Sequence, residues 1–188
     1  MVMAELIERL RRASIGATFN FYRDGDGAEV RCHRLRTYLE ARQNAPLLLV
    51  GEAAGHRGAR VSGIPFTSER LLSGRGPAEA TATIVRRTLA ELGLEQETLC
   101  WNVVPTHPHL PERPETNRRP TRVEVEASRP FLSQLARGRR VVAVGRLAYA
   151  ALGGTYIRHP SHGGAAEFRA GLLAFRPGGQ RVRRFSER

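Results

Sequence analysis

Pro46-Leu47-Leu48-Leu49-Val50-Gly51 is the stretch of sequence that indicates the fold most directly. Its apolar residues stand between a proline and a glycine, which is typical of a short strand buried on both faces. Three further segments are expected to be strands, and they are residues 99–104, 141–144 and 156–158. Strands of this kind form parallel sheets that helices cover on both faces.

The segments between these strands have the apolar spacing of helices. The expected helices cover residues 1–12, 77–92, 122–135 and 146–152, with a possible kink at Pro130. Alternating strands and helices predict an α/β fold of three layers, α/β/α, with a central four-stranded parallel sheet. We expect one domain over residues 1–176 and a loose basic tail over residues 177–188.

The charge of the chain indicates a polyanionic partner. Thirty basic residues against 18 acidic ones give a net charge of +12 in 188 residues, and every basic residue is arginine. A GC-rich genome would account for the missing lysine but not for the net excess. Arginine side chains bind phosphate oxygens through two hydrogen bonds, so nucleic acid is the expected partner.

Several classes of protein are not indicated. No apolar run approaches the length of a membrane span, and residues 1–12 lack the apolar stretch of a signal peptide. We therefore expect a cytoplasmic protein that makes no membrane contact and is a monomer. Cys32 and Cys100 form no CxxC pair, so we expect reduced thiols, no metal and no cofactor.

Polar segments follow the predicted strands at the points where they end. They are Gly51-Glu52-Ala53-Ala54-Gly55-His56, the region that begins at Asn102, and His159-Pro160-Ser161-His162-Gly163-Gly164. Ligands of parallel sheets bind at the carboxyl ends of the strands, so one shared site is expected there. Residues 105–120 hold five prolines and are expected to form an extended surface loop.

Together these segments resemble the uracil-DNA glycosylase superfamily, over residues 47–164, and are most similar in layout to its family-four enzymes. Gly51–Gly55 with Gly63-Ile64-Pro65-Phe66 resembles the first motif. Asn102-Val103-Val104 with Asn117-Arg118-Arg119-Pro120 resembles the middle signature, and His159-Pro160-Ser161 resembles the second motif. The resemblance implies a glycosylase that removes a damaged base from DNA.

Two departures from the family pattern affect the expected chemistry. Family-four enzymes hold an iron-sulfur cluster with four cysteines, but Thr106 and Ser128 stand at two of those positions here. We therefore predict no cluster. Ala53 stands where the best-known superfamily members have a water-activating aspartate. Family-four relatives also lack this aspartate, so its absence does not exclude activity, but the sequence offers no obvious general base.

The resemblance assigns roles to several residues of the site. Phe66 would stack on a base extruded from the helix, and the Asn102 amide would pair with the polar edge of uracil. Gly51 and Ala53 would line the same pocket. His159 would donate a hydrogen bond to the uracil O2 and stabilise the anionic leaving group. Glu52 would either position the attacking water or pair with an arginine.

A second group of residues is expected to contact DNA. Ser161 with the amides of His162 and Gly163 would hold a phosphate, and His56, Arg57, Arg118 and Arg119 would bind elsewhere on the strand. Gly163 falls where many relatives have an apolar wedge that fills the vacated stack, so Phe168 or Arg169 is a candidate substitute.

The sequence therefore predicts a monofunctional uracil-DNA glycosylase that leaves an abasic site and has no lyase activity. Two alternatives stay open. One is a glycosylase for another deaminated base, such as hypoxanthine or xanthine, because one asparagine does not distinguish the bases. The other is a DNA-binding module that recognises damage without cleaving, which Ala53 keeps open.

Overall fold

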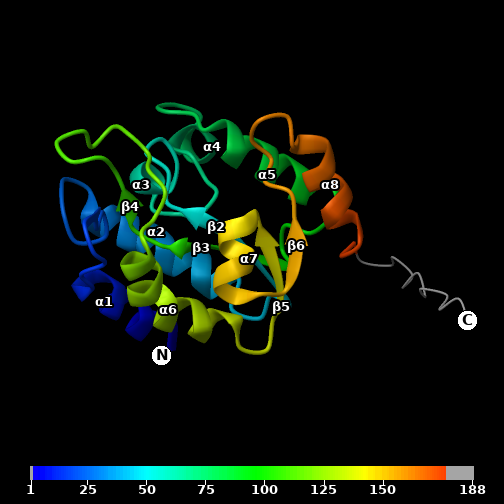
Figure 1. Ribbon diagram of the computed structural model, residues 1–188, viewed down its shortest axis with the longest axis horizontal. Coiled ribbons are helices and arrows are strands. Elements are labelled where there is room, and N and C mark those ends of the chain that lie inside the picture. The colour runs from blue at the N-terminus through cyan, green and yellow to red at the C-terminus, as the bar shows by residue number, and fades with distance from the viewer. Residues whose placement is uncertain (1, 177–188) are drawn as a thin grey trace, which may run out of the picture.

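A four-stranded parallel sheet forms the centre of the protein, in a computed structural model that describes residues 2–176 (Figure 1). The strands lie in the order β3-β2-β5-β6. They are β2 (Leu47–Ala53), β3 (Thr98–Val104), β5 (Arg140–Val144) and β6 (Thr155–Ile157). The predicted α/β fold with a four-stranded parallel sheet is confirmed. The predicted tail, residues 177–188, lies outside the described residues.

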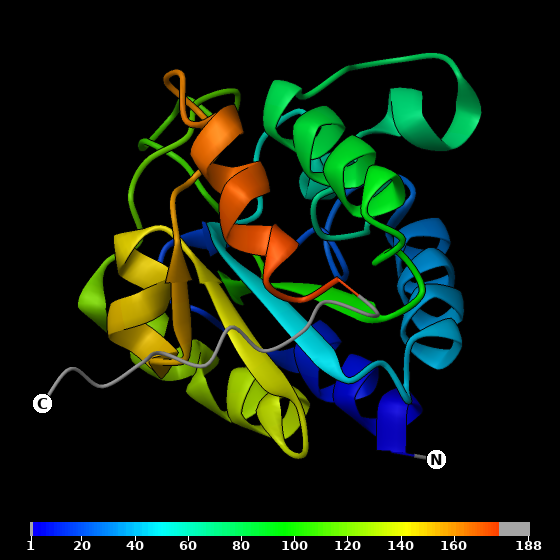
Figure 2. The same cartoon turned by 90° about the vertical axis from the view of Figure 1, so that its right-hand side faces the viewer.

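Helices cover both faces of this sheet. In Figure 2, α5 and α8 lie on one side of the strands and α6 and α7 on the other. The helices are α1 (Val2–Arg12), α2 (Ala28–Ala41), α3 (Ala59–Ser62), α4 (Glu69–Ser73), α5 (Ala80–Glu91), α6 (Arg122–Ala136), α7 (Arg146–Leu152) and α8 (Ala165–Leu173). None of the helices between residues 2 and 176 is both long enough and apolar enough to cross a membrane.

Burial and capping explain why these segments adopt their structures. All seven residues of β3 are buried, as are Leu47–Gly51 of β2, which shows that helices and loops cover both faces of the inner strand β2 and of the edge strand β3. Helix α6 begins with a capping box, in which the Thr121 hydroxyl and the Glu124 carboxylate each accept a hydrogen bond from the other residue's backbone N–H. Pro130 lies inside α6 and does not end it.

The loop of residues 105–120 differs from the expected surface loop. Its first part is buried, because β4 (His107–Pro108) pairs antiparallel with β1 (Thr18–Phe19). The hydroxyls of Thr18 and Thr106 are 2.6 Å apart, and His107 Nδ1 lies 2.9 Å from the carbonyl of Ala54. These bonds hold the start of the loop against the end of β2, so only its later part is a surface loop.

Candidate active site

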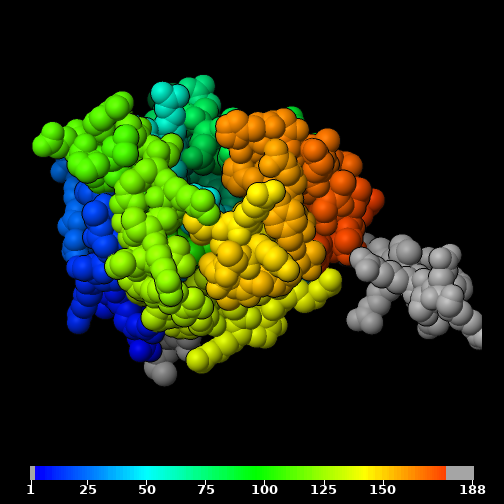
Figure 3. Space-filling view, viewed as in Figure 1, coloured from blue at the N-terminus to red at the C-terminus, as the bar shows by residue number. Residues whose placement is uncertain are grey.

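A cavity of about 810 Å³ opens at the edge of the sheet where the parallel strands end. Figure 3 shows it as a hollow between the loop of residues 105–120, α7 and the loop of residues 158–164. Its walls include several residues selected from the sequence, namely Glu52, Ala53, Phe66, Asn102, Arg118, His159, Ser161 and His162. The segments that resembled separate motifs therefore surround one cavity.

Phe66 packs its ring against the sheet beside Asn102. The residue is 7% exposed, and its backbone φ of 51° is a left-handed conformation that residues other than glycine seldom adopt. A Cβ atom on Gly51 would collide with the ring and would stand 3.0 Å from Asn102 Oδ1. Gly51 therefore makes room for the ring, and the Arg86 guanidinium of α5 holds the turn by donating to the carbonyl of Pro65 at 3.3 Å.

Asn102 carries a side-chain amide that no described protein group binds. It lies on β3 directly opposite Gly51, is 4% exposed, and lines the cavity. Buried amides in proteins are normally paired with other polar groups. The donor and the acceptor of Asn102 are therefore both available to a ligand in the cavity.

His159 is held at one ring nitrogen and open at the other. Its Nδ1 lies 3.2 Å from the backbone nitrogen of Ser161 and 2.7 Å from the Ser161 hydroxyl. A backbone N–H can only donate, so Nδ1 accepts and the neutral ring carries its proton on Nε2. Burial lowers the pKa of His159, and the nearby His162 and Arg158 lower it further. The ring therefore presents a neutral N–H donor.

Ser161 connects the two histidines of this loop. Its hydroxyl lies 3.0 Å from Nδ1 of His162 as well as 2.7 Å from Nδ1 of His159. Because the His159 nitrogen accepts, the hydroxyl donates to His159 and accepts from His162. The predicted role of Ser161, a phosphate contact, did not include this bond to His159. The phosphate contact of Ser161, His162 and Gly163 stays a prediction.

Two carboxylates line the described part of the cavity, Glu52 and Glu79. Burial raises the pKa of Glu52, and the charge of Arg119 opposes that effect without a direct ion pair. Ala53 contributes only a methyl group to the wall. Glu79 immediately precedes α5 and was not selected from the sequence, because no motif surrounds it and only the fold brings it to the cavity.

Arg118 has a structural role that the DNA-binding prediction did not include. Its guanidinium donates to both carboxylate oxygens of Glu124, at 2.8 and 2.6 Å, and to the carbonyl of His109 at 2.8 Å. Glu124 is 1% exposed. Burial alone would raise the pKa of Glu124, but its bonds to Arg118 and Thr121 bring the pKa below its usual value. Arg118 therefore fixes the loop to the start of α6.

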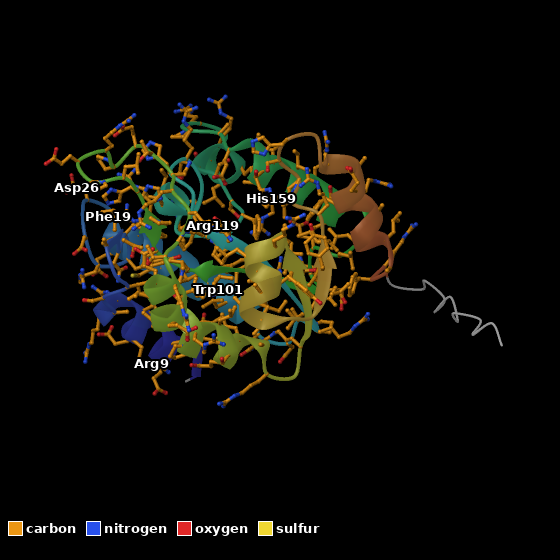
Figure 4. The ribbon with its side chains drawn as sticks, in the orientation of Figure 1. Arg9, Phe19, Asp26, Trp101, Arg119 and His159 are labelled. Carbon is orange, nitrogen blue, oxygen red and sulfur yellow. The ribbon has the colours of Figure 1, made fainter. Side chains whose placement is uncertain are left out.

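The other residues predicted to contact DNA are close in sequence to residues that line the cavity, such as Gly55 and Arg118. Arg57 and Arg119 are exposed, and no described carboxylate pairs with either. Figure 4 shows that Arg119 and His159 come from the loops on either side of the hollow. The backbone N–H of His56 donates to Asn117 Oδ1 at 2.8 Å, which ties the loop after β2 to the loop of residues 105–120.

The candidate wedge residues have different surroundings. Phe168 is fully buried in α8, so the suggestion that it enters the DNA stack is wrong. Its spacing from the buried Leu172 is that of one helical face packed on the core. Arg169 is exposed and lies 3.5 Å from Glu91. A Cβ atom on Gly163 would meet no atom within 4 Å, so this position faces open space.

An exposed pair of aromatic rings lies beside the cavity and was missed in the sequence. Tyr149 of α7 and Tyr156 of β6 are 49% and 42% exposed, and their ring centroids are 5.9 Å apart. Tyr156 lines the cavity together with Arg146 and Arg158. Aromatic rings next to arginines are typical of surfaces on which bases stack. The pair was missed because its two tyrosines come from different elements, α7 and β6, and only the fold brings their rings together.

The residues at the cluster positions do not fit an iron-sulfur cluster. Such clusters need cysteine thiolates, whereas Thr106 and Ser128 supply hydroxyls that bond Thr18 and the carbonyl of Glu124. Cys32 and Cys100 are buried in α2 and β3 as free thiols. Over residues 2–176, no three side chains of His, Cys, Asp or Glu gather as metal ligands do.

The sequence model of the uracil DNA glycosylase superfamily matches residues 39–177. The protein therefore belongs to this superfamily, which places it among the DNA glycosylases. No curated protein matches the chain significantly.

The solved structures that are similar to this protein include a SMUG2 and a UNG. SMUG2 of Pedobacter heparinus aligns over 92% of this chain and 94% of its own, with 14% identity and a TM-score of 0.64. UNG from Nitratifractor salsuginis aligns over 93% of this chain and 96% of its own, with 16% identity and a TM-score of 0.45. At 14% identity, the likeness to SMUG2 shows a shared fold.

Proposed function

We propose that this protein is a monofunctional DNA glycosylase that extrudes uracil from DNA and hydrolyses its N-glycosidic bond. The observation that carries the proposal is the unpaired amide of Asn102, which is 4% exposed and faces the cavity beside the Phe66 ring. An amide with a free donor and a free acceptor matches the adjacent N–H and carbonyl groups of a uracil edge. The ring beside it offers a surface on which the base can stack.

His159 would stabilise the uracil anion as it leaves the sugar. As the glycosidic bond breaks, its electron pair remains on the base, and negative charge develops on the carbonyl oxygens of the uracil. The Nε2–H of a neutral His159 donates to one of these oxygens and stabilises the charge without transferring a proton. The lowered pKa of His159 keeps the ring neutral at physiological pH.

The surface of the protein supports a DNA substrate. The net charge of +12 attracts the phosphate backbone, and Arg57 and Arg119 are exposed in the loops whose residues Gly55 and Arg118 line the cavity. A damaged nucleotide pairs weakly, which lowers the energy needed to extrude it. The arginines would hold the strand while the nucleotide enters the cavity.

The test uses oligonucleotides that carry one uracil, hypoxanthine or xanthine, followed by alkali treatment that breaks the strand at abasic sites. We expect cleavage at uracil, and a rate roughly 10²–10³-fold lower for His159→Ala. His33→Ala, an exposed histidine on α2, is the matched control and should keep the wild-type rate. Faster cleavage at hypoxanthine or xanthine would reassign the substrate. Binding without cleavage of any oligonucleotide would indicate a damage-recognition module instead.

A further inference from the structure

Glu79 is a carboxylate that the structure places in the cavity without a partner. It lines the cavity wall just before α5, and no described donor forms a hydrogen bond or an ion pair with it. Structural carboxylates of buried regions are normally bound, as Glu124 is by Arg118 and Thr121. Glu79 has no such bond with any described group, so its carboxylate oxygens are free to accept hydrogen bonds from a ligand or a water molecule in the cavity.

Two glycines make room for this carboxylate. A Cβ atom on Gly55 or on Gly58 would collide with its oxygens. Both glycines belong to the loop that continues β2 beyond Ala53, so the carboxylate lies in a notch at the carboxyl end of the central strand. Side chains larger than hydrogen at these positions would displace it.

Glu79 also lies on the side of the sheet where the base is proposed to bind. Gly51 faces the Phe66 ring, and Arg86 of α5 donates to the carbonyls of Pro65 and Phe66. The Phe66 turn is therefore fixed to the same helix that Glu79 precedes. Side chains alternate along a strand, so Glu52 starts from the opposite face of β2 to Gly51 and Ala53.

We propose that Glu79 activates the water molecule that attacks the sugar, an inference that rests on the proposed glycosylase function. The glycosidic bond breaks and its electron pair leaves with the base. The water oxygen forms a bond to C1′ of the deoxyribose, and one water proton passes to a carboxylate oxygen of Glu79. Glu79 then gives this proton to the departed base anion, directly or by exchange with solvent that protonates the anion, so the products are neutral uracil and an abasic site.

The environment of Glu79 suits this role. Burial raises its pKa above that of an ordinary carboxyl group, and no nearby cation opposes the effect. A carboxylate with a raised pKa is a stronger base toward water. Burial also raises the pKa of Glu52, and the positive charge of Arg119 opposes that rise.

The test compares the wild type with Glu79→Gln, which keeps the shape and removes the base. We expect the single-turnover rate of uracil removal to fall roughly 10²–10⁴-fold. Affinity for an oligonucleotide that carries non-cleavable 2′-fluoro-deoxyuridine should stay within about twofold, since a proton acceptor for water acts after binding. Glu40→Gln, an exposed glutamate on α2, is the matched control and should retain the wild-type rate.

A second variant tests the notch itself. Gly55→Ala leaves the carboxylate in the protein but displaces it, and we expect at least a tenfold loss of rate with unchanged affinity. A wild-type rate in Glu79→Gln, or an equal loss of binding and cleavage, would overturn the role of Glu79 and leave the proposed function intact. Should Glu79→Gln unfold, a wild-type rate in Gly55→Ala would overturn it. A wild-type protein that cleaves none of the oligonucleotides would overturn the proposed function, and this inference with it.

Discussion

Asn102 and Asn20 are both buried asparagines, and replacing each with leucine is expected to have opposite consequences. The Asn20 amide donates to the carbonyls of Leu10, Arg11 and Ala13, and its oxygen accepts from the backbone N–H of Tyr22. Asn102 has no such bonds with any described group. Leucine has a similar branched shape, so each replacement removes the amide and leaves an apolar side chain.

The number of bonds sets the size of the effect on stability. The two N–H groups of the Asn20 amide share three carbonyls, so with the bond from Tyr22 about three hydrogen bonds are lost. At about 1 kcal/mol per hydrogen bond, Asn20→Leu should lower the free energy of unfolding by roughly 3 kcal/mol. For a chain of this length that corresponds to a fall in Tm of about 6–12 °C. Asn102→Leu breaks no bond within the protein, so its free energy of unfolding should change by less than about 1 kcal/mol, or increase.

Activity should follow the reverse order. Asn102→Leu removes both polar contacts to the base, and a site that has lost hydrogen bonds to its substrate loses roughly 10²-fold or more in rate. Asn20→Leu should cleave normally at temperatures where it is folded. Thermal unfolding followed by circular dichroism, with uracil cleavage measured on the same samples, gives both quantities. A strongly destabilised Asn102→Leu that still cleaves uracil would refute the view that this amide is kept for a ligand.

Three further predictions concern other parts of the structure. Arg118→Ala should destabilise the fold by roughly 3–5 kcal/mol in urea unfolding, because it leaves the buried Glu124 without its cation; a loss below about 1 kcal/mol would argue against this. Since the folded pKa of Glu124 is lowered, its contribution to stability is present above its unfolded pKa of about 4.3 and is lost as pH falls through the folded value, which urea midpoints measured in acid can follow. Tyr156→Ala should weaken DNA binding by about 1–3 kcal/mol in fluorescence anisotropy, with unchanged salt dependence, if a base stacks on this ring.

Most of the sheet and its helices could be predicted from the sequence, because each signal was local. Residues 47–50 form an apolar run between two residues that limit strands, and the capping residues Thr121 and Glu124 stand at the start of α6. Helix α2 was not predicted. Its apolar residues Cys32, Leu35, Tyr38 and Leu39 are buried on one face, but many arginines between them obscure the helical spacing.

The site could be predicted only where its residues belonged to a recognisable motif. Phe66, Asn102 and His159 do, and they line one cavity. Glu79 and Tyr156 do not, since each reaches the cavity through packing between elements that are distant in the sequence. Phe168 was given a surface role because the helix that buries it, α8, was not predicted. Residues that depend on tertiary packing alone leave no pattern in a single sequence.

The bond between the Ser161 backbone and Nδ1 of His159 has a consequence for which bases the cavity accepts. A main-chain N–H can only donate a hydrogen bond. If the imidazole carried its proton on Nδ1, the bond from the Ser161 backbone would be lost. The open nitrogen of the neutral ring therefore always offers hydrogen. Under the proposed function, a base with an amino group at this point would place a donor against a donor, whereas a base with an oxygen or an unprotonated ring nitrogen there would accept the hydrogen bond. The loop would then discriminate between bases before any bond to the sugar is broken.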